Sequence, residues 1–133
     1  MKHGAKTLLW VNAVLFILFG AGFMFAPTLL ATWITGSSPS TTSGTIDLRA
    51  TYGGLAFGLG IFWAMCASNG SHKIGLLSAF LVFASVAIGR IIGMIVDGSP
   101  NGFMFALLIA EVVFAATSLL LYKQKVTKHE QPS

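Results

Sequence analysis

The chain has 133 residues, of which 55% are hydrophobic and only 9% are charged, and its mean hydropathy is +0.81. A soluble domain carries roughly 25% charged residues, so this composition excludes an ordinary water-soluble protein. The formal net charge is +4, but eight Lys and Arg residues placed at the ends of apolar segments do not make the basic surface that nucleic acid requires.

Four apolar runs are each long enough to cross a bilayer as a helix, which needs roughly 20 residues. The predicted spans cover residues 8–26, 46–67, 74–96 and 103–122. Lys2 and Lys6 precede the first run as they would in a signal peptide, but this run is longer than a signal peptide's apolar core, so we interpret it as a retained helix. The sequence therefore predicts an all-α, polytopic membrane four-helix bundle, a single transmembrane domain over residues 1–133.

The connections between these spans differ in chemistry. Residues 27–45 form the longest one; its first half is apolar and suits a short interfacial helix opened by Pro27, and its second half is a Gly, Ser, Thr and Pro loop. The connections at residues 68–73 and 98–101 are short, so the spans that they join are expected to be antiparallel neighbours.

Lysines gather on one side of this arrangement and predict its orientation. They are Lys2, Lys6, Lys73, Lys123, Lys125 and Lys128. Positive residues in short loops stay on the cytoplasmic side, so both termini, including the tail at residues 123–133, are expected in the cytoplasm and the loop at 27–45 outside. Trp10 and Trp63 near the inner interface and Trp33 near the outer one agree with this orientation.

Small residues mark where the spans should touch, because helices in lipid associate through close backbone contact. The second span contains Gly53, Gly54, Gly58 and Gly60, with Gly54 and Gly58 four apart, and the third contains Gly89 and Gly93. We expect these glycines at helix contacts inside the bundle. A contact face with a second copy of the chain, or with another membrane protein, is the alternative.

Five charged residues fall within or at the edges of the spans, where charge is costly. They are Asp47, Arg49, Arg90, Asp97 and Glu111. All five are expected in the outer half, with Arg90 about 10 Å deep and Glu111 roughly 12–15 Å deep from helical rise. Arg90 and Glu111 lie on hairpin neighbours, which predicts a charge-assisted pair. Asp97 ends a helix, where the macrodipole disfavours an acid, so it requires a cation, and we favour Arg49 as its partner. Tyr52 lies one turn from Arg49.

These residues resemble a bacterial family of small four-helix membrane proteins, domain of unknown function 4345. The resemblance rests on the segment from Asp47 to Leu55, on Gly89-Arg90 and Asp97-Gly98, and on Glu111-Val112. It implies a four-span fold, with the charged residues, Tyr52 and the paired glycines at the family's recurrent positions. It implies a multi-pass protein of the bacterial inner membrane and carries no activity.

Three functional hypotheses stay open. The first is a polar pocket in the outer half, lined by Arg49, Tyr52, Arg90, Asp97 and Glu111, that binds a small amphiphile, lipid or anionic ligand or relays protons through Glu111. The second is a structural or accessory subunit whose buried charges only fix helix packing. The third is a membrane enzyme acting on a lipid head group, although we identify no catalytic constellation. No cofactor or metal is expected, because the histidines lie at the termini or in a loop and Cys66 is the single cysteine.

Overall fold

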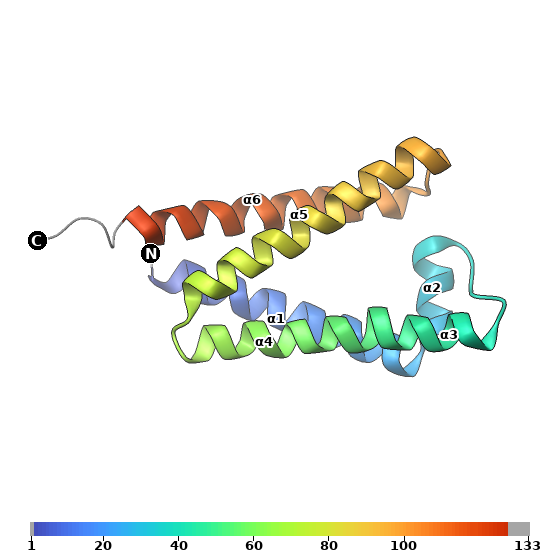
Figure 1. Cartoon of the computed structure of the whole chain (residues 1–133), viewed down its shortest axis with the longest axis horizontal. Coiled ribbons are helices and arrows are strands. Elements are labelled where there is room, and N and C mark those ends of the chain that lie inside the picture. The colour runs from blue at the N-terminus through green and yellow to red at the C-terminus, as the bar shows by residue number, and fades with distance from the viewer. Residues whose placement is uncertain (1, 128–133) are drawn as a thin grey trace, which may run out of the picture.

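The computed structural model describes residues 2–127, and these residues are helical apart from short connections. The elements are α1 (Lys2–Phe25), α2 (Pro27–Thr35), α3 (Thr42–Leu48), η1 (Arg49–Leu55), α4 (Ala56–Ser68), α5 (His72–Asp97) and α6 (Gly102–Thr127). The elements α3, η1 and α4 follow one another without a break and make one long helix (Figure 1). Within residues 2–127, four helices are long and apolar enough to cross a membrane, as the sequence predicts.

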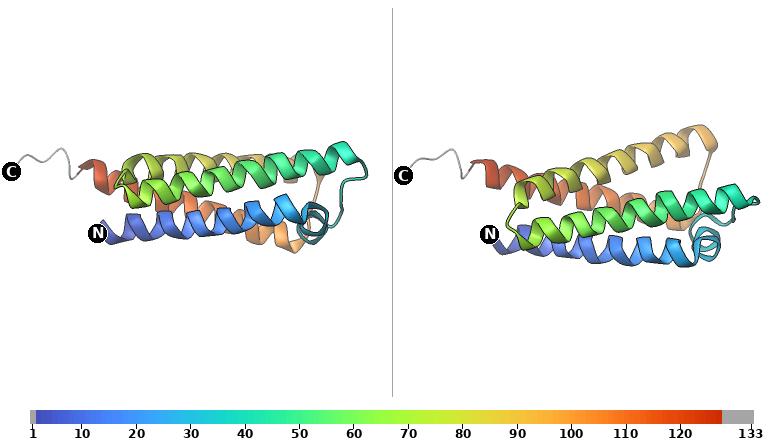
Figure 2. Two further views of the ribbon diagram at one scale, coloured as in Figure 1. Left: turned by 90° about the horizontal axis from the view of Figure 1, so that it is seen from below. Right: turned by 60° about the horizontal axis from the view of Figure 1, so that its bottom comes forward.

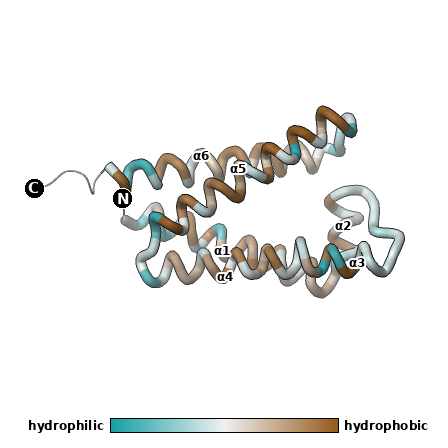
Figure 3. Tube along the Cα trace, in the orientation of Figure 1, coloured by the Kyte–Doolittle hydropathy of each residue, from teal (hydrophilic) through white to brown (hydrophobic). Residues whose placement is uncertain are grey.

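The start of α1 and the end of α6 lie at the same end of the bundle, which we call the terminal end (Figure 1). The opposite end, called the loop end, carries α2, α3 and the connection between α5 and α6. Polar residues concentrate toward these two ends, and apolar residues run along the helices between them (Figure 3). The lysines of the described residues, from Lys6 to Lys125, lie toward the terminal end, and Lys128 lies outside the described residues.

The helices form two antiparallel pairs. Helix α1 packs most extensively against α4 and η1, and α5 packs most extensively against α6. The pairs meet in the terminal half, around Leu9, Trp63 and Leu76, which are fully buried. They separate toward the loop end (Figures 1 and 2). In α5, accordingly, no residue beyond Ala87 is buried.

An aromatic layer closes the core where the two pairs begin to separate. The Phe83 ring stacks on Phe114 at 5.1 Å between centroids and on Trp63 at 5.8 Å. Phe16 meets both Trp63 and Phe83 edge to face. These four rings come from α1, α4, α5 and α6, so a single layer ties all four spans together.

Glycines let α1 approach η1 and α4 closely, but only at two of the positions that the sequence singles out. A Cβ added at Gly60 would come within 2.9 Å of the Ala13 carbonyl oxygen, and one at Gly53 within 2.9 Å of the Met24 nitrogen. Gly53 and Gly60 therefore both lie where α1 meets the long helix.

The expectation is wrong for Gly54, Gly58, Gly89 and Gly93. Cβ atoms at Gly58 and Gly89 would meet nothing within 4 Å, and those at Gly54 and Gly93 would meet only their own helices. Gly53 and Gly60 are seven residues apart and lie on the face in contact with α1. Gly54 and Gly58, which are four residues apart, lie outside that face.

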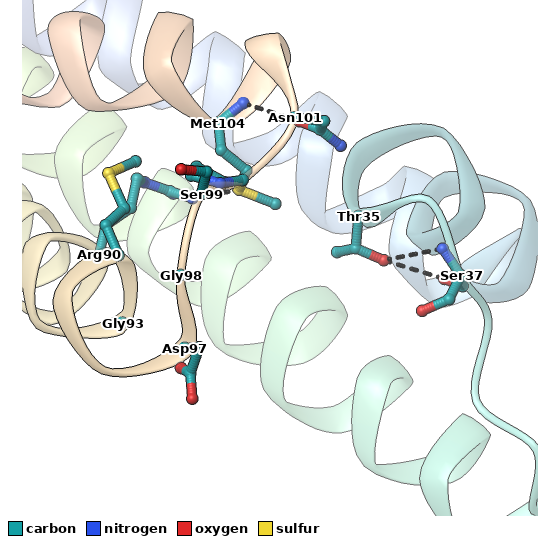
Figure 4. A pocket seen from close by; sticks show the side chains of 11 residues that line it. Thr35, Ser37, Arg90, Gly93, Asp97, Gly98, Ser99, Asn101 and Met104 are labelled. Atoms are coloured by element: carbon teal, nitrogen blue, oxygen red, sulfur yellow. Dashed lines mark hydrogen bonds between the residues drawn. The ribbon is translucent and has the colours of Figure 1, made fainter.

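Helix α2 begins with Pro27 at its first turn, as expected, and ends at Gly36, whose φ of 86° is in the left-handed region. The Gly36 N–H donates to the Thr32 carbonyl at 2.9 Å. This stop turns the chain across the loop end and brings Thr35 and Ser37 near the end of α5 (Figure 4).

Candidate functional site: a polar cleft at the loop end

Arg90 and Glu111 form the ion pair that the sequence predicts. The Arg90 Nε lies 3.0 Å from Glu111 Oε2, and Nη2 lies 2.5 Å from Oε1. Two parallel contacts of this kind give the fork geometry in which arginine binds carboxylates most strongly. The Arg90 and Glu111 side chains are 19% and 10% exposed, and Glu111 belongs to the buried face of α6. Each charge therefore compensates the other where solvent is scarce.

The outer edge of the Arg90 guanidinium has a weaker partner. Its Nη1 donates to the Met104 sulfur at 2.8 Å. A thioether is a poor acceptor, so this edge keeps hydrogen-bonding capacity after the carboxylate is satisfied. Arg90 therefore holds Glu111 on one side and offers donors on the other.

These donors face a cleft of about 690 Å³ at the loop end. The last turns of α5 line it with Arg90, Met94 and Asp97, and Met104 closes it from the start of α6. Thr35 and Ser37 contribute hydroxyl groups from the end of α2 (Figure 4). The lining thus combines one guanidinium, one carboxylate and several hydroxyls with methionine side chains.

Asn101 also lines the cleft, although it is not among the site residues predicted from the sequence. Its side-chain nitrogen donates to the Ile34 carbonyl at 3.1 Å, and its side-chain oxygen accepts from the Met104 N–H at 3.0 Å. It therefore caps α6 and ties α6 to α2. An asparagine directly before an apolar run is an N-cap signal that was available in the sequence.

Over residues 4–122, the chain matches the family model described as "Domain of unknown function (DUF4345)". The chain belongs to the DUF4345 family. Searches of curated proteins and of solved structures gave no match to it.

The most specific part of the DUF4345 resemblance, Leu48 to Gly54, falls almost entirely in η1. This segment is a π-helix, a wider turn that is rare in proteins and frequent at functional sites. Arg49 within it donates from Nη1 to the carbonyl oxygen of Met24, in the last turn of α1. Such carbonyls have no partner within their own helix, so Arg49 joins the end of α1 to η1.

The sequence-based pairing of Arg49 with Asp97 is therefore wrong. Among residues 2–127 the one ion pair is that of Arg90 with Glu111. The Asp97 side chain is exposed and points away from Arg90 (Figure 4). The Tyr52 ring packs against Phe23 of α1 in a tilted arrangement, with 5.3 Å between the ring centroids, and neither Tyr52 nor Arg49 lines the cleft. The five predicted residues thus divide: Arg90, Asp97 and Glu111 belong to the cleft and its support, and Arg49 and Tyr52 to the contact between α1 and η1.

The described residues of this DUF4345 protein contain no group of three or more His, Cys, Asp or Glu side chains that could hold a metal ion. The chemistry that the cleft does offer is hydrogen bonding and charge. Its Arg90 donors, Asp97 acceptors and hydroxyl groups suit recognition of a polar head group.

Proposed function

We propose that this protein binds a small amphiphile with an anionic head group in the loop-end cleft, as a multi-pass protein of the bacterial inner membrane with both termini in the cytoplasm. The observation that carries the proposal is the outer edge of Arg90. The Arg90 side chain is largely buried, so a hydrogen bond to it would be strong, and the present acceptor at this edge is a thioether sulfur rather than an oxygen. A phosphate oxygen there would gain a charge-assisted hydrogen bond.

The surroundings of Arg90 support a lipid-like ligand. The cleft lies where the end of α2 meets the end of α5 and the start of α6, and its polar lining residues follow directly on the apolar stretches of these helices. Large side chains on the outward faces, such as those of Leu18, Ile88 and Ile109, are exposed as lipid-facing residues are. The acyl chains of a bound lipid would lie against these outward faces. Hydroxyl groups of a head group could donate to Asp97 at its rim.

Phosphatidylglycerol is the appropriate probe, because its head group combines one phosphate with two hydroxyls. The purified protein is incubated with phosphatidylglycerol or phosphatidylcholine in detergent and examined by native mass spectrometry. We expect the wild type to retain phosphatidylglycerol preferentially. The double variant Arg90→Gln/Glu111→Gln removes both charges and leaves neither one uncompensated, so it should lose the preference while staying folded.

Asp47→Asn provides the matched control, because Asp47 is an exposed charge outside the cleft that accepts a hydrogen bond from the Thr51 hydroxyl of the same long helix. It should bind phosphatidylglycerol as the wild type does. Equal retention of both lipids by the wild type, or unchanged preference in the double variant, would contradict the proposal.

A second candidate is a structural or accessory role, favoured by the closed geometry of the ion pair itself. Three contacts satisfy both carboxylate oxygens of Glu111. Under this reading the pair fixes how α5 meets α6, and the cleft is incidental. The double variant would then lower thermal stability or recovery of a partner and leave lipid selectivity unchanged.

A further inference from the structure

Polar side chains continue along the bundle axis beyond the ion pair, on the inward face of α6. This face is formed by Glu111, Ala115, Ser118, Tyr122 and Lys125, spaced alternately by four and three residues. Glu111, Ala115 and Ser118 are buried, and Tyr122 packs against the core. Alternating spacings of this kind place all five residues on the side of α6 that meets the other helices. Four of these five inward-facing residues are polar.

Asn12 of α1 adds a polar group between two of these positions. Gly4 of α1 lies against the Leu121 side chain, 3.7 Å from the Gly4 Cβ position, and the two helices are antiparallel. Helical rise then places Asn12 at roughly the level between Glu111 and Ser118. We use the name polar seam for Glu111, Asn12, Ser118, Tyr122, Lys125 and His72.

The middle of the polar seam has hydrogen-bonding capacity that the described residues do not satisfy. Asn12 and Ser118 are both 0% exposed, and neither the Asn12 amide nor the Ser118 hydroxyl has a protein partner among residues 2–127. Buried amides and hydroxyls without partners are costly, and in folded proteins ordered water commonly bridges them. In a bilayer the cost is larger still, so these groups require a polar occupant.

The seam ends in a titratable pair at the terminal end. His72 Nδ1 lies 3.1 Å from Lys125 Nζ. A lysine ammonium donates to this nitrogen, which places the ring proton of neutral His72 on Nε2, and Nε2 is buried without a partner among the described residues. The charged neighbours at each end are Arg90 for Glu111, and Lys125 and Lys73 for His72.

We infer that the polar seam holds ordered water and conducts protons between the loop-end cleft and the terminal end. The Lys125 ammonium passes a proton to His72 Nδ1 while His72 Nε2 releases its own proton to water in the seam. That proton passes along water held by Ser118 and Asn12 to the Glu111 carboxylate, which releases it to water in the cleft, and Lys125 takes up a new proton from water at the terminal end. Every transfer breaks one O–H or N–H bond and forms another, so no further reactant is needed. Embedded carboxylates and histidines in chains of this kind are typical of proton relays. The inference does not depend on a ligand in the cleft.

Proton flux into vesicles tests this inference. The full chain is reconstituted into phosphatidylcholine vesicles that contain a pH-sensitive dye, and a potassium gradient with valinomycin sets the membrane potential. We expect flux above that of protein-free vesicles. Glu111→Gln keeps the size of the side chain but cannot titrate, and it should abolish this flux, since losing a positioned proton-transfer group typically costs about a hundredfold in rate.

Two variants probe the middle of the seam, and one neighbour serves as a control. Asn12→Leu and Ser118→Ala should each lower the flux about fivefold, the factor that corresponds to one net hydrogen bond. Thr117→Val is the matched control, because the Thr117 hydroxyl donates to the Val113 carbonyl of its own helix at 2.8 Å. It should conduct as the wild type does.

Wild-type flux equal to that of protein-free vesicles would overturn the inference. So would seam variants that conduct normally and differ only in melting temperature, which is the outcome of a purely structural role. Ser118→Ala removes a single oxygen atom, so it keeps the test valid if Asn12→Leu fails to fold. Because phosphatidylcholine vesicles contain no anionic lipid, failure here leaves the lipid-binding experiment independent.

Discussion

The contact between α1 and α4 gives a sharp prediction from two glycines of one helix. Gly60 faces α1, and a Cβ there would lie 2.8 Å from the Ile17 nitrogen and 2.9 Å from the Ala13 oxygen. Both are backbone atoms, so relief requires the two helices to move apart. Gly58 lies on the same helix, and a Cβ there would meet nothing within 4 Å.

We expect Gly60→Ala to destabilise the protein by about 1–3 kcal/mol, the usual cost of overpacking a closely fitted contact. Gly58→Ala should be neutral or should stabilise by roughly 0.5–1 kcal/mol, because alanine loses less conformational freedom in a helix than glycine does. The two substitutions therefore differ by about 1–4 kcal/mol for the same chemical change.

Reversible unfolding in mixed micelles of variants that carry Trp10→Phe and Trp33→Phe, followed by the fluorescence of Trp63, measures this difference, since Trp63 lies in the core one turn from Gly60. Equal stability of the two variants would refute the reasoning, because the contact between α1 and α4 would not depend on Gly60. Loss of stability in Gly58→Ala alone would instead place the contact on the face that the spacing of four residues indicates.

Three further predictions concern single interactions. Glu111→Ala should cost about 3–5 kcal/mol by leaving Arg90 uncompensated, and a double-mutant cycle with Arg90→Ala should recover part of this loss in the unfolding free energy. Arg49→Ala should cost about 1 kcal/mol and raise amide hydrogen exchange at the end of α1, because the Met24 carbonyl loses its donor. Trp63→Phe should cost about 1 kcal/mol in thermal unfolding, because the indole donates to Ser78 Oγ at 3.0 Å; an unchanged stability would mean that this bond contributes nothing net.

The number of spans and the pairing of Arg90 with Glu111 were predictable from the sequence for a common reason. Hydrocarbon imposes a length on each helix and a cost on each charge, and both depend on residue type and spacing alone. A short connection made α5 and α6 neighbours, and the depths of the two charges then left few other partners. Residue type and spacing were therefore sufficient to predict the four spans and this ion pair, because a bilayer restricts both the length of a helix and the placement of a charge.

The glycine contacts and the partner of Arg49 were not predictable in the same way. A spacing of four identifies a helix face but does not say which neighbour covers that face. The π-helix from Arg49 to Leu55 adds to this difficulty, because its wider turn changes the angular position of every residue that follows. Composition does not indicate a π-helix, so the face of α4 that contacts α1 is known only from the structure.

Asn12 and Ser118 show what a search restricted to charges leaves out. A charge in a membrane is conspicuous because it is rare, whereas an amide or hydroxyl also occurs as a partner for its own backbone. Thr117 is such a case, and adjacent Ser118 is not, yet the two residues differ by one methyl group. The two residues differ because they lie on different faces of α6: Ser118 shares the inward face with Glu111, and Thr117 does not. Alternating steps of four and three residues, counted along α6 from Glu111, lead to Ser118, Tyr122 and Lys125. This count needs only the sequence, and it places the three residues on the same helix face as Glu111.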